Sequence, residues 1–358
     1  MSIEAPRVRV GTDMIRFRTP IAGFARLIFS FVAVSTPSHA QSVAEFYRGK
    51  TITYNLAVPD GASWGLYARN FIEHLRKHIP GNPNIILQVM PGGGGVAAGN
   101  HIYNVAPKDG TVIGTPLSTA IVFAATDPKE VMYDPRKFSW IGSLAVIQDV
   151  ISVWHTAPAK TIEEAKKTEL IMGATGKGSN SFQDIALANN LLGTKFKSVR
   201  GYKGGAEINI AIERGEVHGR ANTWDGWPGA QPDWLREKKL IHLVQLGPRK
   251  LPEIGGDVPL FRDLVNEPEQ KIVDFIGLGL TMGRSVYAPP GIPADRLAAL
   301  RQALVETVKD PAYIAAAKRQ ALDTDTMQPG EVIEKVVNEA FSLPPALIEK
   351  AKAAIDLP

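Results

Sequence analysis

The chain has 358 residues, of which 44% are hydrophobic and 21% are charged. This composition is typical of a globular protein with a sizeable core, and it excludes disorder over most of the length. The formal net charge is +4, but residues 1–40 carry five arginines against Glu4 and Asp13, so the rest of the chain is close to neutral. We therefore expect no nucleic-acid partner. The chain has no cysteine, which excludes disulfides, thiolate metal sites and a lipid-bearing cysteine.

Residues 1–40 have the order of a secretory signal. Arginines precede an apolar run at 27–34, and the small-residue motif Ser38-His39-Ala40 follows it. The run is too short to span a bilayer, which takes about 20 apolar residues. We predict cleavage after Ala40 and a periplasmic chain that begins at Gln41. Two residues are candidate starts for this signal: Met1 and Met14.

From about residue 51 the sequence alternates β-rich runs with helical patterns, and glycine-rich turns join them. The first unit has a strand pattern at 51–58, a turn at 61–65 and a helix pattern at 66–79. Similar units recur at 170–192 and 196–214. This alternation predicts an α/β fold.

The turn GASWG matches the G-x-S-x-G motif of serine hydrolases, with Ser63 as the nucleophile. Three observations oppose that reading. Ser63 lies only 22 residues after Gln41, the glycine run at 92–95 follows the motif instead of preceding it, and the last histidine of the chain is His242. A hydrolase that uses Ser63 is kept as the enzyme alternative, and ester cleavage that is lost in Ser63→Ala would support it.

Two histidines one helical turn apart, His74 and His78, have a spacing that can bind a metal. The stretch HLRKH lacks the glutamate of the zinc-protease motif. Positive side chains suit the last turn of a helix, where they complement the helix dipole. We expect both histidines to face solvent, and we predict no metal and no cofactor.

Glycine- and hydroxyl-rich turns recur where helices are expected to begin, at 61–64, 92–96, 178–181 and 204–205. Unpaired backbone N–H groups and the positive end of the helix dipole suit a carboxylate at such places, without any catalytic group. One such loop alone is equally well a tight turn of an α/β fold. Several together favour a ligand site.

Seven stretches of the sequence, in this order, resemble the solute receptors of tripartite tricarboxylate transporters, also called Bug proteins. They are TITYNLAVPDGASWGLYAR at 51–69, MPGGGGVAAGNHIYNVAPKDGT at 90–111, WIGSL at 140–144, GYKGGAEIN at 201–209, RGEVHGR at 214–220, DVPL at 257–260 and APPGIP at 288–293. The order and spacing of these motifs, from about Phe46 to the C-terminus, carry the resemblance.

The resemblance implies an α/β protein with the two-lobed type II fold of periplasmic binding proteins, a Venus flytrap whose hinged cleft closes on an organic acid. Lobe 1 would comprise residues 43–145 and 283–358, and lobe 2 residues 146–282. The crossings between lobes would lie in β-rich runs at 147–154 and 277–287. Receptors of this family deliver the acid to a large and a small membrane subunit. We expect a monomer, and a receptor for a membrane sensor is a further alternative.

The resemblance also implies which residues bind the ligand, through backbone, hydroxyl groups and ordered water. The residues of the first lobe would be Gly61, Ala62, Ser63, Trp64, Thr115, Ser118 and Thr119. The residues of the second lobe would be Gly178, Ser179, Asn180, Ser181, Lys203, Gly204, Gly205, Thr223 and Asp225.

The chain departs from the family pattern at Gly65, where many relatives have an aspartate four residues before the arginine that is Arg69 here. An aspartate there would serve an amino or hydroxyl group, so its loss argues against an amino-acid ligand. Trp64, Trp224 and Trp227 would suit an aromatic acid, and they suit a core or the rim of a cleft equally well. Aromatic and dicarboxylic acids are both candidate ligands.

Overall fold

The computed structural model describes residues 41–60 and 63–357. The predicted signal segment, residues 1–40, lies outside the described residues, and so do Gly61 and Ala62. Within the described part, no helix combines the length and the apolar character that a membrane span requires.

Two β-sheets organise the described residues. The first contains six of the strands found there, in the order β11-β4-β10-β3-β1-β2, and the second contains five, in the order β7-β6-β8-β5-β9. The strands are β1 Thr51–Leu56, β2 Asn84–Val89, β3 Val112–Thr115, β4 Ser139–Ser143, β5 Asp149–Trp154, β6 Leu170–Ala174, β7 Phe196–Arg200, β8 Gly219–Thr223, β9 Leu240–Leu246, β10 Ser285–Ala288 and β11 Gln328–Pro329.

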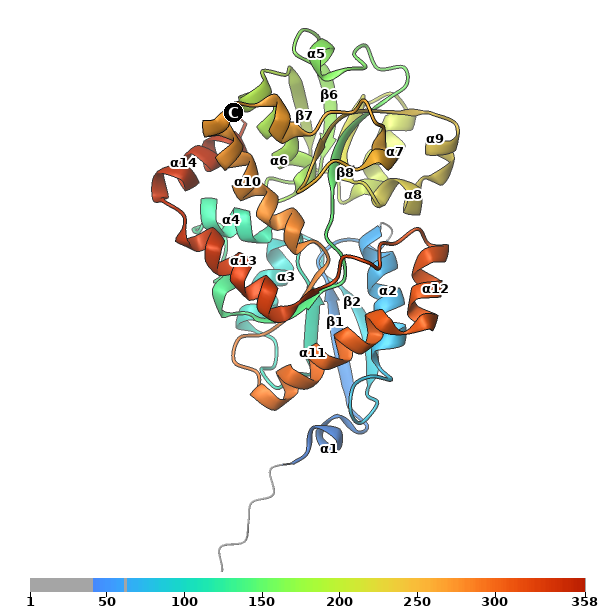
Figure 1. Cartoon of the computed structure of the whole chain (residues 1–358), viewed down its shortest axis with the longest axis vertical. Helices are drawn as coiled ribbons and strands as arrows, with labels where there is room; N and C mark the ends of the chain where they lie inside the picture. The colour runs from blue at the N-terminus through green and yellow to red at the C-terminus, as the bar shows by residue number, and fades with distance from the viewer. Residues whose placement is uncertain (1–40, 61–62, 358) are drawn as a thin grey trace, which may run out of the picture. The chain divides into compact units, whose positions relative to one another are not determined.

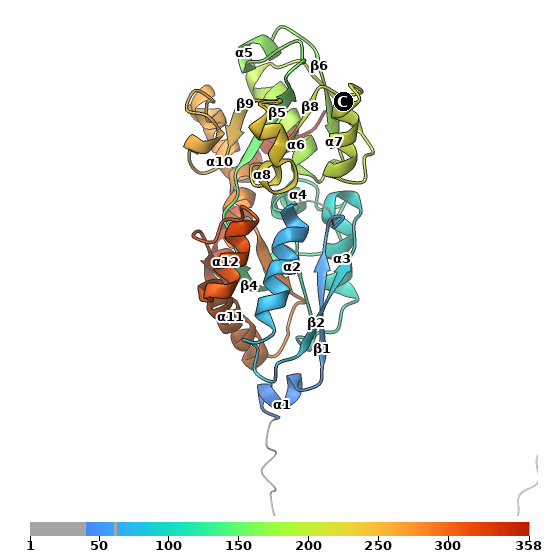
Figure 2. The ribbon, with the colours of Figure 1, turned by 90° about the vertical axis from the view of Figure 1, so that its right-hand side faces the viewer.

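Helices cover both sheets (Figure 1). Helices α2, α11 and α13 contact the first sheet, and α6, α7 and α8 contact the second. Figure 2 shows α2 and α11 beside the first sheet and α6, α7 and α8 beside the second. The helices are α1 Val43–Tyr47, α2 Ser63–Leu75, α3 Val96–Asn104, α4 Ala120–Thr126, α5 Ile162–Ala165, α6 Asn180–Leu187, α7 Gly205–Glu213, α8 Gly226–Ala230, α9 Pro232–Arg236, α10 Glu267–Met282, α11 Ala294–Lys309, α12 Pro311–Arg319, α13 Gly330–Ser342 and α14 Pro345–Ala354. Short 3₁₀ or π turns are η1 Gly93–Gly95, η2 Pro135–Lys137, η3 Ala188–Leu192, η4 Pro252–Ile254 and η5 Phe261–Leu264.

In each sheet, the strands that belong to strand–helix units are parallel to one another. β1 pairs in parallel with β2 and β3, and β6 pairs in parallel with β7 and β8. A helix follows each of these strands, because parallel neighbours need a crossover connection. The loops predicted to bind the ligand therefore follow the carboxyl ends of parallel strands in both sheets.

The chain passes from the first sheet to the second after β4 and returns after α10. The two crossing segments are hydrogen-bonded to each other. The Leu144 amide donates to the Arg284 carbonyl at 3.0 Å, and the Arg284 amide donates to the Ala145 carbonyl at 2.8 Å. A third segment, before β11, joins them, because the Val146 amide donates to Thr326 Oγ1 at 2.9 Å.

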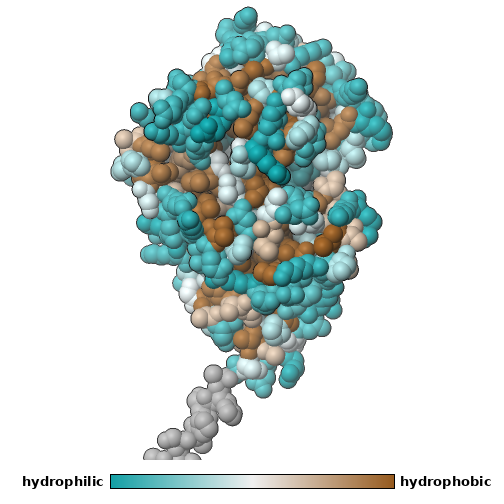
Figure 3. All heavy atoms as spheres, in the orientation of Figure 1, coloured by the Kyte–Doolittle hydropathy of each residue, from teal (hydrophilic) through white to brown (hydrophobic). Residues whose placement is uncertain are grey.

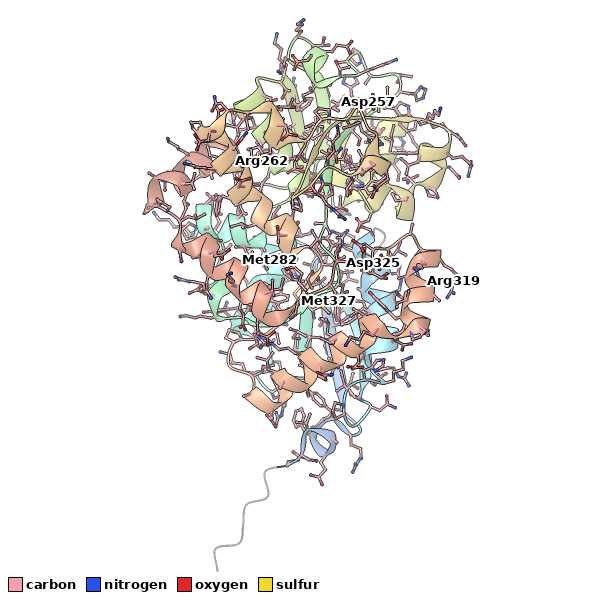
Figure 4. The ribbon with its side chains drawn as sticks, in the orientation of Figure 1. Asp257, Arg262, Met282, Arg319, Asp325 and Met327 are labelled. Atoms are coloured by element: carbon pink, nitrogen blue, oxygen red, sulfur yellow. The ribbon has the colours of Figure 1, made fainter. Side chains whose placement is uncertain are left out.

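The second crossing is largely helical. The β-rich run expected at 277–287 is wrong in its first half, since α10 continues to Met282 and the strand begins at Ser285. Figure 4 shows Met282 between the two sheets, at the end of α10. Gly279 allows this helix to approach a loop of the first sheet, because a Cβ there would lie 2.3 Å from the Ser118 carbonyl oxygen.

Apolar side chains fill the space between the sheets and their helices. Tyr54 and Ile113 of the first sheet belong to one buried cluster with Phe71 of α2 and Leu300 of α11. The face in Figure 3 is largely hydrophilic and carries smaller hydrophobic patches. Burial of the apolar residues supplies the main driving force for this arrangement.

The C-terminal residues pack against elements of the second sheet, although β11 belongs to the first. Helix α14 contacts α10 and η3. Asn190 Nδ2 donates to the carbonyls of Ala353 and Ala354 at 3.1 and 2.9 Å. Lys177 forms an ion pair with Asp356 at 2.9 Å. The end of the chain thus links the layers of both sheets.

Candidate ligand-binding site

Loops from the two sheets meet at the carboxyl ends of their parallel strands. Ser63 begins α2 and donates from Oγ to Asp225 Oδ1 at 3.3 Å. Thr119 Oγ1 donates to the Gly178 carbonyl at 2.5 Å. Both bonds join a loop of the first sheet to a loop of the second, so the structure is closed at this interface. Ligands of open α/β sheets bind at such strand ends.

Arg284, in the second crossing segment, lies at the centre of this interface. Its Nη2 is 2.6 and 2.7 Å from the two carboxylate oxygens of Asp225. The same nitrogen lies 2.9 Å from Ser63 Oγ and 3.1 Å from Thr223 Oγ1. The arginine side chain is 1% exposed and the aspartate side chain 15%. Arg284 therefore joins a crossing segment to loops of both sheets through a buried ion pair.

Aromatic rings pack against the guanidinium of Arg284. Its Cζ lies 3.9 Å from the ring centroid of Trp64 and 5.0 Å from that of Tyr67. Cation–π attraction is strongest for a desolvated cation such as this one. Nη1 is buried and has no hydrogen-bond partner among the described residues. Since a buried donor without a partner is costly, Nη1 marks a place where an acceptor would be stabilising.

A cavity of about 460 Å³ adjoins Asp225. Tyr67 and Trp224 line it, together with Gln148 and Arg249. Its volume falls within the roughly 300–1,000 Å³ of small-molecule sites. Asp225 both lines this cavity and binds the buried guanidinium, so its carboxylate connects the cavity to Arg284.

Glycines allow the loops of the two sheets to approach closely. Gly94, in the turn after β2, has a φ of +67°. A Cβ on Gly94 would lie 2.8 Å from the carbonyl carbon of Gly178. A Cβ on Gly204 would lie 3.1 Å from Pro59 Cγ of the first-sheet loop. Larger residues at Gly94 would therefore push the two loops apart.

The polar side chains of the loop after β6 bond mainly within that loop. Ser179 Oγ donates to the Gly176 carbonyl at 2.7 Å and lies 2.9 Å from Ser181 Oγ. The Thr175 amide donates to Ser181 Oγ at 3.2 Å, and Asn180 Oδ1 accepts from the Ser181 amide at 2.9 Å. These groups order the start of α6. The hydrogen bond to the first sheet's loop is accepted by the Gly178 carbonyl, not by a side chain of this loop.

The remaining predicted residues lie beside or away from the interface. Thr115 Oγ1 donates to the Ser285 carbonyl of β10 at 2.6 Å. Lys203 is exposed. Gly205 faces Arg220, since a Cβ there would lie 2.9 Å from both terminal nitrogens of that arginine. Two further predicted residues lie outside the described residues: Gly61 and Ala62.

Two buried carboxyl groups lie in the second sheet's layers, one on Asp149 at the start of β5 and one on Asp184 of α6. Their residues are 0% and 3% exposed. Burial raises the pKa of Asp149 to about 6, although the charge of Arg284 lowers it in part. Burial, and then the neighbouring carboxyl of Asp149, raise the pKa of Asp184 well above its usual range. The two groups therefore favour protonated forms, as buried carboxyl pairs do.

We expect Asp149→Asn to stabilise the protein at neutral pH. Native Asp149 keeps its proton up to about pH 6, whereas the unfolded carboxyl loses it near 3.8. Between these values the native state binds more protons, so the free energy of unfolding falls as pH rises. Asparagine cannot ionise, so it removes this loss in the free energy of unfolding, which is about 3 kcal/mol. Urea unfolding at about pH 4 and about pH 7.5 measures it, and a variant less stable than the parent at the higher pH would contradict it.

Arg284 and Asp149 are functional candidates that the sequence prediction missed. Each is the single charged residue of an apolar stretch, 275–288 for Arg284 and 139–154 for Asp149. Burial of a charged side chain requires a partner. A lone charge in such a stretch was therefore the available signal for a buried polar site.

Ser63 does not form the hydrogen bonds of a serine nucleophile in the described part of the chain. Its Oγ bonds to Asp225 and to Arg284 there, and no histidine is among these partners. A serine needs an adjacent base, most often histidine, to become nucleophilic. The contacts of Ser63 are those of a polar anchor in the interface.

The two histidines of α2 and its following turn lie against Asp310. His74 Nδ1 is 4.0 Å and His78 Nε2 is 3.1 Å from Asp310 Oδ2. The expectation that both face solvent is wrong, because both side chains are mostly buried where Asp310 caps α12. In the part of the chain that the structure describes, no cluster of three or more metal-ligating side chains occurs.

No protein-family model and no curated protein matches this sequence. Solved structures do resemble the chain. The periplasmic binding protein BugD has 16% identity and a TM-score of 0.68 over 87% of this chain and 99% of its own. MatC from Rhodopseudomonas palustris with bound malate has 18% identity and a TM-score of 0.65, over 84% and 99%. A second R. palustris protein, with adipate, has 17% identity and a TM-score of 0.62, over 85% and 97%.

These likenesses show the fold. The chain has the two-lobed α/β fold of periplasmic binding proteins, with two sheets joined by crossing segments. The predicted fold class is confirmed. The predicted resemblance to Bug receptors is also confirmed, because BugD is among the solved structures that are similar to the chain.

Proposed function

We propose that this chain is an extracytoplasmic solute-binding protein of the Bug type, which captures a small organic carboxylate for a tripartite tricarboxylate-type transporter. The observation that carries the proposal is the buried guanidinium of Arg284, held between the two sheets on a carboxylate. The structural likeness to BugD, and to proteins whose structures contain malate and adipate, supports this ligand class.

The proposed lobes are residues 43–145 with 283–358, and residues 146–282. Opening would be a rotation about the crossing segments, which separates the loops joined by Thr119 and Gly178. Ligand then stabilises the closed form only to the extent that it binds that form better than the open one.

Arginine suits a carboxylate because its planar fork presents N–H groups with matching geometry. In the structure the Asp225 carboxylate takes this place, at 2.6 and 2.7 Å from Nη2. A ligand carboxylate would exchange with Asp225 on the guanidinium, while Nη1 supplies a further donor. Ser63 and Thr223, which share the same nitrogen, would orient the exchanged group.

The cavity beside Asp225 would hold the rest of the ligand. Trp224 and Tyr67 provide apolar walls. Arg249 brings a second positive charge, beside the carboxyl groups of Glu253 and Asp323, which also line the cavity. A dicarboxylate could therefore place one carboxylate on Arg284 and direct the other to Arg249. The other residues predicted from the resemblance, such as Thr119 and Gly178, would act by closing the site.

The location and the partners that we propose rest on the signal-like segment at residues 1–40 and on the family resemblance. The mature chain would begin at Gln41, act in the periplasm as a monomer, and hand its ligand to a large and a small membrane subunit.

A thermal-shift screen tests the function directly, since a ligand that binds only the folded state raises the melting temperature. The panel contains mono-, di- and tricarboxylates and aromatic acids, with malate and adipate among them. We expect at least one carboxylate to stabilise the mature chain. Asp225→Asn should then bind that acid more tightly, by roughly tenfold, because the competing internal carboxylate is gone.

The control for Asp225→Asn is Asp274→Asn, which removes the partner of Arg262 from an exposed ion pair. This variant should bind as the parent does, because exposed pairs contribute little. Weaker binding in Asp225→Asn would show that Asp225 holds the ligand instead of competing with it. A panel without any stabilising acid would contradict the proposed function.

A further inference from the structure

A second cavity, of about 250 Å³, lies on the α7–α8 side of the second sheet. Figure 2 shows the ribbons of α7 and α8 beside the second sheet. Its floor is β8, through Arg220 and Asn222, and its walls are α7 and α8. Side chains alternate between the two faces of a strand, so Thr223, which contacts Arg284, belongs to the opposite set. The volume greatly exceeds the roughly 10–15 Å³ that one water requires.

Arg220 brings an uncompensated positive charge into this cavity. The residue is 6% exposed, and its Nε donates to Asn209 Oδ1 at 3.0 Å. Among the described residues, no carboxylate forms an ion pair with Arg220. Burial lowers its pKa to about 9. An arginine in such surroundings is strongly stabilised by an anion.

Two further donors near Arg220 lack a partner. One belongs to Asn222 on the cavity floor, and the other to Trp227, which packs against Arg220 and is not itself a lining residue. Asn222 Nδ2 and Trp227 Nε1 are buried and have no hydrogen-bond partner among the described residues. The guanidinium of Arg220 lies 4.7 Å from the ring centroid of Trp227. Native proteins rarely leave several buried donors unpaired, so the cluster calls for an acceptor.

Glycines allow the starts of α7 and α8 to approach the floor of this cavity closely. A Cβ on Gly205, at the start of α7, would lie 2.9 Å from both Nη1 and Nη2 of Arg220. A Cβ on Gly226, at the start of α8, would lie 2.6 Å from Asn222 Nδ2. Both helix starts therefore pack directly against the floor side chains, and a larger residue at either glycine would displace Arg220 or Asn222.

We propose that this cavity is a second ligand site, which binds a small carboxylate independently of Arg284. One guanidinium with neutral amide donors matches a singly charged, planar acceptor. Exposed Glu213 lines the same cavity and accepts from Trp234 Nε1 at 3.1 Å. Its charge disfavours multiply charged anions such as phosphate.

The test follows the indole N–H signal of Trp227 by NMR in the ¹⁵N-labelled mature chain, with sodium acetate as the probe at constant ionic strength. The signal is assigned by its loss in Trp227→Phe. We expect a saturable shift in the parent and in Arg284→Gln, whose first site is disabled. We expect the shift to disappear in Arg220→Gln.

A second variant distinguishes lost binding from misfolding of Arg220→Gln. Asn222→Asp places an acid on the cavity floor and should also abolish the shift, whereas Arg200→Gln, which alters an arginine outside this cavity, should preserve it. The absence of a saturable shift in the parent would overturn the proposal. So would a shift that persists in folded Asn222→Asp. A shift with sulfate and none with acetate would overturn the carboxylate assignment.

Discussion

Arg284→Gln is expected to lower the affinity for the carboxylate found by screening at least about a hundredfold. The loss of one partner from a buried, hydrogen-bonded charge pair costs about 2–5 kcal/mol. Arg284 is 1% exposed and stacks on Trp64, so water cannot replace it. Isothermal titration of parent and variant measures the effect. Arg284→Lys should lose most of the affinity as well, because an ammonium cannot present the planar fork.

The control for this prediction is Arg262→Gln, which removes an arginine from an exposed pair with Asp274. Its affinity should equal that of the parent. Arg284→Gln also leaves Asp225 without its partner, so the double variant with Asp225→Asn separates lost binding from lost stability. If the double variant is folded and binds within twofold of the parent, the ligand does not use Arg284.

Local patterns predicted the parts of the site that depend on local structure. The strand, glycine-rich turn and helix unit at 51–79 places Ser63 at the end of a parallel strand. Thr223 and Asp225 were predicted from the family resemblance, and the three residues meet at the interface. The order of strand, turn and helix decides which loops share one edge of a sheet, and this rule gave the position of Ser63.

The partner that joins these three residues could not be found in the same way. Arg284 is separated from Ser63 by 221 positions in the sequence. Its role depends on how the second crossing packs against both sheets. That crossing was expected to be a β-rich run over residues 277–287. In the structure its first part is the end of α10, and Gly279 permits close contact between this helix and the Ser118 carbonyl.

The loop after β6 shows a second limit of sequence reasoning. Hydroxyl groups next to glycines predicted ligand contacts for Ser179 and Ser181. In the structure these hydroxyls bond to Gly176, to Thr175 and to each other. Serine side chains compete for nearby backbone groups, so a hydroxyl-rich turn can order itself. Composition alone does not distinguish a turn that binds a ligand from one that satisfies its own polar groups.

Gly94→Ala should weaken ligand binding by preventing closure, by roughly tenfold or more. A Cβ at this position would lie 2.8 Å from the Gly178 carbonyl carbon and 2.9 Å from the Ser179 nitrogen. These are backbone atoms of the opposite loop, which cannot move aside by changing a rotamer. The clash therefore shifts the population toward the open form, and apparent affinity falls with the closed fraction. Isothermal titration measures the affinity, and small-angle X-ray scattering measures the radius of gyration with and without ligand.

Gly93→Ala is the matched control. Gly93 and Gly94 have φ values of +57° and +67°, so alanine at either position carries a similar left-handed strain of about 1–2 kcal/mol. A Cβ on Gly93 would meet only Val96 Cβ, at 3.4 Å. Both variants should therefore lose similar stability toward urea, but only Gly94→Ala should bind weakly and scatter as an open form in the presence of ligand. Equal affinities in the two variants would show that closure does not require this contact, and the loop after β2 would have no part in holding the ligand.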